Sequence, residues 1–211
     1  MGAKRGERTG GVTLIEVLVV FGLVGLLMTV VTAVFQLSSR SSKESGERTE
    51  RLVESSNLAE FIRAALTSSV RSGNTFHYQT TGSPNKDLAM SVISTEDNTG
   101  QRGWDAVQQA PLYQSYKIFF LDSTAGIIRR FQQPTTATTT GLPLSPVQLQ
   151  TAISTAEFKD VVHGVTDFEI FDPQDSATTT SPTNPLGVRW VVVNAKDAPQ
   201  RTEFVCRIPS M

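Results

Sequence analysis

Residues 10–37 have the sequence GGVTLIEVLVVFGLVGLLMTVVTAVFQL, and this stretch decides the architecture of the chain. Within it, residues 17–37 form a run of 21 residues without a charge. A helix needs about 20 apolar residues to cross the hydrocarbon core of a bilayer. A secretory signal peptide has a shorter apolar core followed by small residues, whereas this run ends in Phe35, Gln36 and Leu37. The stretch therefore predicts one membrane-spanning helix that stays attached to the protein.

The residues before the apolar run set its orientation. Residues 1–11 contain three basic side chains, Lys4, Arg5 and Arg8, and one acidic side chain, Glu7. Positive charge that flanks a first membrane helix remains on the cytoplasmic side. We therefore expect a single-pass membrane protein whose C-terminal part lies outside the cytoplasm.

One acidic residue, Glu16, stands at the start of the apolar segment. An ionised carboxylate at bilayer depth is costly unless a cation pairs with it. Cleavage of the bond between Gly11 and Val12 would create such a cation, because it would free an α-amino group four residues before Glu16.

These residues together resemble the class III signal of type IV prepilins and pseudopilins, in which a basic leader ends in glycine and a Thr-Leu-Ile-Glu-Val string follows. The resemblance implies that prepilin peptidase cuts between Gly11 and Val12, that Val12 is N-methylated, and that Glu16 acts in filament assembly. It also implies that the chain is held in the inner (cytoplasmic) membrane and that its partners are other pilins or pseudopilins. Val12 departs from the phenylalanine usual in the family, and Ala33 stands where resembling pilins have a proline.

The helix is expected to continue beyond the membrane, since no proline interrupts the chain before Pro84. Apolar residues then recur at helical period; they include Leu52, Ala59, Ile62, Leu66 and Val70. We expect one helix over residues 12–70. This gives four parts: a leader (1–11), a membrane half of the helix (12–37), an amphipathic half outside the cytoplasm (38–72) and a globular domain (73–211).

After residue 73 the apolar pattern changes to a period of two, which is typical of strands. The expected strands are residues 75–80, 88–94, 116–121, 127–132, 166–171, 188–194 and 202–208. The clearest hairpin joins 116–121 to 127–132 through a turn from Asp122 to Gly126. The fold class predicted is α+β, pilin-like, with the long helix packed on an antiparallel sheet.

Two sets of core positions follow from the strand alternation. Ile118 and Phe120 are expected to lie beneath the helix stripe at Ile62 and Leu66. In the last strand the alternation places Phe204, Cys206 and Ile208 on one side, and we expect that side to face inward.

The hairpin and residues 162–170 add a second resemblance, to minor pseudopilin J and to W-type minor pilins, which lie at or near a filament tip.

Two segments rich in threonine and proline, 134–146 and 176–185, are expected to be loops.

Signals for catalysis, metals or cofactors are sparse. His77 and His163 are the only histidines, Cys206 is the only cysteine, and none of the common catalytic or phosphate-binding motifs occurs. We expect no enzyme, no cofactor and no metal site; Asp172 and Asp175 are interpreted as acidic surface. Without its leader the chain would carry a net charge of minus three, from 16 basic and 19 acidic residues, so no nucleic acid is expected as a partner.

The sequence thus predicts a minor pilin or pseudopilin, a structural or priming subunit of a type IV pilus or type II secretion filament. The alternative is a permanently anchored single-pass protein with a binding domain outside the cytoplasm. The mature N-terminal residue distinguishes the two.

Overall fold

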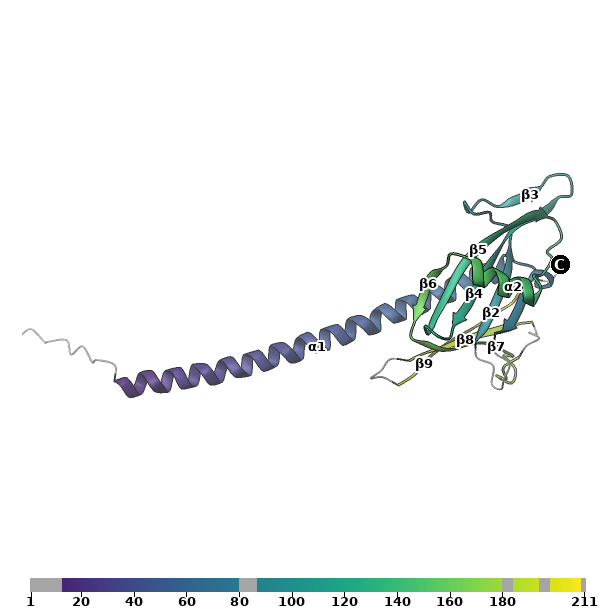
Figure 1. The fold of residues 1–211 in the computed structure, drawn as a ribbon. Coiled ribbons are helices and arrows are strands. Elements are labelled where there is room, and N and C mark those ends of the chain that lie inside the picture. The colour runs from purple at the N-terminus through teal and green to yellow at the C-terminus, as the bar shows by residue number, and fades with distance from the viewer. Residues whose placement is uncertain (1–12, 80–86, 180–183, 194–197, 210–211) are drawn as a thin grey trace, which may run out of the picture. The chain divides into compact units, whose positions relative to one another are not determined.

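The computed structural model describes residues 13–79, 87–179, 184–193 and 198–209 (Figure 1). The chain divides into two compact units, residues 1–50 and 51–211, and one long helix contributes to both. The described part contains mixed α and β structure, with a long N-terminal helix that packs on antiparallel sheets, so the predicted fold class is confirmed.

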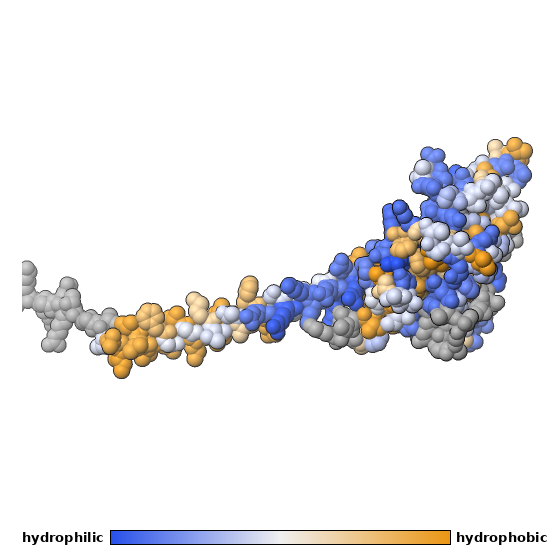
Figure 2. Space-filling model, viewed as in Figure 1, coloured by the Kyte–Doolittle hydropathy of each residue, from blue (hydrophilic) through white to orange (hydrophobic). Residues whose placement is uncertain are grey.

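Helix α1 (Leu14–Thr67) is the long N-terminal element. In the first unit its side chains are exposed. Figure 2 shows hydrophobic residues along its first part and hydrophilic residues farther along. By length and composition it can cross a membrane.

The helix ends at Thr67, three residues before the predicted Val70. Hydroxyl groups explain this end: Thr67, Ser68 and Ser69 donate side-chain hydrogen bonds to the carbonyls of Arg63, Ala65 and Leu66. Such bonds satisfy carbonyls that the last turn leaves without partners. A short 3-10 helix (Arg71–Gly73) then leads into the strands.

The second unit contains two antiparallel sheets. The larger has the order β1-β2-β4-β5-β6, with β3 paired to β4, and the smaller has the order β7-β8-β9. The strands of the larger sheet are β1 (Thr75–Tyr78), β2 (Leu88–Ser94), β3 (Gly103–Asp105), β4 (Ala110–Asp122), β5 (Ile127–Thr138) and β6 (Lys159–His163). The smaller sheet contains β7 (Val165–Phe171), β8 (Leu186–Val192) and β9 (Gln200–Cys206).

All seven predicted strands are present, as β1, β2, β4, β5, β7, β8 and β9. The β4–β5 hairpin has the expected register, with Asp122 opposite Ile127. In its turn Gly126 has φ of 66°, in the left-handed region that glycine adopts without strain. The predicted ends at Thr80 and Asn194 lie outside the described residues. The sequence analysis missed β3 and β6.

The prediction that residues 134–146 form a loop is wrong at both ends. Strand β5 continues to Thr138, and helix α2 (Pro146–Thr155) begins at the last residue of the segment. The helix start has a clear local cause: Ser145 and Gln148 form a reciprocal capping box, and Pro146 occupies the first turn. The segment 176–185 contains no strand or helix in its described part.

The two faces of the larger sheet bury different sets of side chains. On one face, Leu58, Ile62 and Leu66 of α1 pack with Phe119 and Leu121, in a core that the smaller sheet shares. On the opposite face, α2 contributes Leu149 and Ala152, which pack with Ile118 and Phe120.

The prediction that Ile118 and Phe120 lie beneath the α1 stripe is therefore wrong. The side chains of β4 point alternately to the two faces of the sheet, and both faces are apolar and buried here. The face that does not meet α1 is covered by α2. Phe119 and Leu121 are the residues that share the core with α1. Leu52, assigned to the stripe, is 56% exposed. Phe204, Cys206 and Ile208 are buried as predicted.

Candidate functional site

The first turn of α1 contains the one predicted site residue that the structure describes, Glu16. Gly11 and Val12 lie outside the described residues. Glu16 accepts hydrogen bonds at Oε2 from the Thr13 backbone N–H (2.9 Å) and from Thr13 Oγ1 (3.0 Å). The backbone N–H of Glu16 donates in return to Thr13 Oγ1 (3.4 Å). Thr13 and Glu16 therefore cap the helix reciprocally, in the Thr-x-x-Glu pattern of a capping box.

This geometry adds a role for Glu16 that the sequence analysis missed, although the Thr13-Leu14-Ile15-Glu16 pattern would have indicated it. The carboxylate at the start of the apolar run has two donors within its own chain. Both bonds end on Oε2, and Oε1 accepts none from the residues that the structure describes. One carboxylate oxygen is thus available to a further donor.

The polar side chains farther along the apolar run are also satisfied locally. Thr29 Oγ1 donates to the Gly25 carbonyl (2.8 Å), and Thr32 Oγ1 donates to the Met28 carbonyl (2.8 Å). In lipid, polar groups have no water to bond with, so they need such partners within the helix. This stretch of α1 is consistent with a lipid surrounding.

The histidines and the cysteine lie on three separate elements. His77 lies in β1, His163 ends β6, and Cys206 ends β9. His163 Nδ1 lies 3.2 Å from Glu54 Oε1, and burial raises the pKa of the Cys206 thiol, which disfavours a reactive thiolate. No group of three His, Cys, Asp or Glu side chains within the described ranges is arranged to hold a metal ion.

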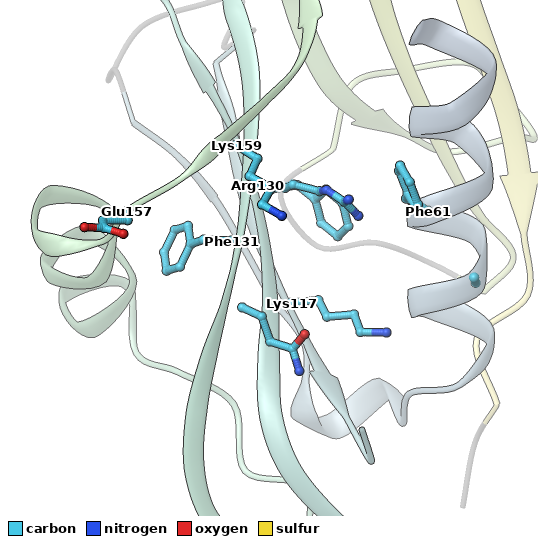
Figure 3. A pocket seen from close by; sticks show the side chains of 9 residues that line it. Phe61, Lys117, Arg130, Phe131, Glu157 and Lys159 are labelled. Atoms are coloured by element: carbon cyan, nitrogen blue, oxygen red, sulfur yellow. The ribbon is translucent and has the colours of Figure 1, made fainter. Parts of the chain in front are cut away.

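The second unit contains a cleft of about 400 Å³ between α1 and the β4–β5 strands. Its lining combines aromatic rings with basic side chains; the residues are Phe61, Ala64, Lys117, Phe119, Arg130, Phe131, Gln132, Glu157 and Lys159. Figure 3 shows Lys117 and Arg130 directed toward α1, where Phe61 lies. The sequence analysis did not identify this cleft.

Arg130 is the central cation of the cleft. Its guanidinium carbon lies 3.8 Å from the centroid of the Phe61 ring, a cation–π distance. Burial lowers the pKa of Arg130 from its ordinary value, although a guanidinium stays protonated in proteins. Lys117 forms an ion pair with Glu96. The cleft is thus suited to bind an anionic group beside an apolar one.

No family model matches this chain, and searches of curated proteins and of solved structures found no match.

Proposed function

We propose that the chain is a minor pilin or pseudopilin that prepilin peptidase processes and that enters or primes a type IV pilus or type II secretion filament. The observation that carries the proposal is a single helix, Leu14–Thr67. Thr13 and Glu16 cap its first turn, its first part exposes apolar side chains, and its last part packs on antiparallel sheets. The Gly11-Val12 bond precedes that helix start by two residues. The protein is then a structural subunit rather than an enzyme.

In the proposed assembly, cleavage frees an α-amino group on Val12. The amine of one subunit pairs with Glu16 of its neighbour, whose Oε1 accepts no bond from the described residues, while Oε2 remains engaged in the helix cap. In an apolar surrounding two opposite charges attract strongly at short distance, and loss of one partner leaves the other charge uncompensated. The pairing therefore aligns subunits along the filament axis, with the subunits held in the inner membrane before assembly.

The competing function is a permanent membrane anchor that carries a binding domain outside the cytoplasm. The cleft beside Arg130 favours this function, because a binding domain needs a site and the cleft has the volume of a small-ligand pocket. In this alternative the chain keeps residues 1–11.

The decisive test is the mature N-terminus in wild type and in Gly11→Leu. We expect wild type to begin at Val12, and Gly11→Leu to keep its leader and stay out of filaments, because the bulky side chain blocks the peptidase. Gly6→Leu makes the same change within the leader and should be processed normally. Intact wild-type leader, or normal processing of Gly11→Leu, would contradict the proposal.

A second test separates processing from assembly. Glu16→Gln should be inserted and cleaved, but recovered poorly in sheared filaments relative to membranes, because the neutral amide cannot neutralise the amine. Glu50→Gln, on an exposed part of the same helix, is the matched control. The effect should be weaker for a subunit that only caps the tip. Equal ratios of filament to membrane protein in wild type and Glu16→Gln would remove the assembly role.

A further inference from the structure

The cleft beside Arg130 contains more positive than negative charge. Lys117 is neutralised by Glu96. Neither Arg130 nor Lys159 forms an ion pair with any residue that the structure describes. Glu157 is the only acidic residue in the lining, and Figure 3 places it beside α2, across the strands from the Arg130 guanidinium. The part of the cleft nearest α1 is therefore cationic.

The strand register fixes these two cations side by side. Arg130 on β5 pairs directly with Lys159 on β6. Arg130 is half-buried and its guanidinium packs on Phe61. The neighbouring Arg129 differs, since it forms ion pairs with Asp122 and Asp160. A guanidinium that is partly removed from water, without a carboxylate, lacks the partner that such groups normally have.

The cleft continues along the strand beyond Arg130. Pairing between β5 and β6 ends at Arg130, whereas β5 extends to Thr138. A second cleft of about 310 Å³ lies beside α2, and it shares Phe131, Gln132 and Glu157 with the first. Together the two clefts form an elongated groove that crosses β5 beyond its pairing with β6. The groove is cationic near Phe61, and beyond Phe131 it is lined mostly by polar side chains.

We propose that this groove binds an extended acidic segment of another protein chain, with a carboxylate against Arg130 and Lys159, one flanking apolar side chain against Phe61 and another against Phe131. A planar carboxylate matches the forked donors of a guanidinium. The elongated shape fits a peptide, and the aromatic lining fits its apolar side chains. The few cations give little support for a polyphosphate or nucleic acid, which need several phosphate contacts at once. The site does not depend on processing at Gly11.

The test uses the full chain in zwitterionic detergent micelles, with ¹³C-labelled alanine methyl groups. The probe is the peptide acetyl-Ser-Leu-Glu-Leu-Ser-amide, and its matched control contains Gln in place of Glu. Ala64 lines the cleft and reports occupancy, while Ala89 is buried on the opposite face of the sheet. We expect the Ala64 methyl signal to shift saturably with the Glu peptide, the Ala89 signal to stay in place, and the Gln peptide to bind about tenfold more weakly.

Variants test which cations are responsible. Arg130→Gln and Lys159→Gln should each weaken binding of the Glu peptide, Arg130→Gln by about tenfold. Arg207→Gln removes the same charge from an exposed position outside the groove and should bind as wild type. Lys159 is exposed, so its variant keeps the test valid if Arg130→Gln does not fold.

Three results would overturn the proposal. They are an Ala64 signal that does not move with the Glu peptide, equal affinities for the Glu and Gln peptides, and wild-type affinity in both groove variants. Phosphatidylglycerol added to the micelles is a competitor. If it displaces the Glu peptide at a concentration below that of the peptide, the site prefers a lipid headgroup and the proposal is wrong.

Discussion

The two ends of helix α1 have similar apolar residues in different surroundings. Near the N-terminus, Phe21 and Phe35 are 71% and 74% exposed. Near the C-terminal end, Leu58, Ile62 and Leu66 are fully buried. The first stretch is apolar all round, whereas the second is apolar on one stripe.

The difference shows that apolar composition alone does not define a protein core. Apolar residues that recur at helical period form a stripe on one side of the helix, and that side packs on a core. In the second unit the sheets form this core with the stripe. A helix that is apolar on every side needs lipid or other helices around it. The same element therefore has the length and composition of a membrane-spanning segment in one unit and is a core element in the other.

The largest expected effect contrasts core phenylalanines with a phenylalanine in the exposed apolar stretch of α1. Phe119→Ala and Phe120→Ala should each lower the free energy of unfolding of the second unit by about 3–5 kcal/mol, because each removes a buried ring from a core cluster. Phe21→Ala should leave that unfolding unchanged. Denaturant titration of the full chain in micelles, followed through the buried Trp190, measures all three. Equal destabilisation by Phe21→Ala would contradict the division between the two stretches.

A smaller effect is expected at Tyr78, which joins the two sheets. Its hydroxyl accepts a hydrogen bond from the Ile170 N–H (3.0 Å), so Tyr78→Phe leaves that buried donor without a partner. The expected loss is about 1–3 kcal/mol of unfolding free energy, measured by the same titration. An unchanged midpoint would show that the donor finds another partner.

Burial also raises the pKa of Tyr78 to about 12, and this sets a pH dependence. Above pH 10 the tyrosine of the unfolded chain loses its proton while the folded one keeps it. The stabilisation is therefore complete below about pH 10 and is lost as pH rises toward about 12. Tyr113 and Tyr116 are shifted in the same direction by burial, so Tyr78→Phe should reduce the fall rather than abolish it. Identical pH profiles would contradict the assignment.

A double-mutant cycle distinguishes the two faces of the larger sheet. Phe120 and Leu149 belong to one core cluster, and Phe119 belongs to the other. Phe120→Ala with Leu149→Ala should be non-additive, with a coupling energy on the order of 1 kcal/mol. Phe119→Ala with Leu149→Ala should be closer to additive. The reverse pattern would restore the face assignment expected from the sequence.

The smallest effect is expected at the start of α1. Thr13→Ala removes the side-chain half of the helix cap, and the first turn should fray. Amide hydrogen exchange of the first turn in micelles should accelerate about fivefold. Exchange in α1 near Leu58 should not change, because tertiary packing stabilises that stretch. An unaltered first turn would show that the cap contributes little there.

Much of the fold was predictable because it rests on local patterns. The apolar run, the helical stripe, seven strands and the Asp122 to Gly126 turn are all set by neighbouring residues, and all are present. Two local signals were overlooked: the capping pattern at Ser145 and Gln148, and the same kind of pattern at Thr13 and Glu16.

The sequence by itself determined where the long helix, seven of the strands and the apolar run long enough to span a membrane lie, since these depend on hydrophobic period and turn chemistry. Only the tertiary structure decided which face of β4 meets α1, because both alternating sets are apolar and the choice depends on α2. It also decided that Phe61, Arg130 and Lys159 meet in one groove, a juxtaposition of three elements that no local pattern encodes.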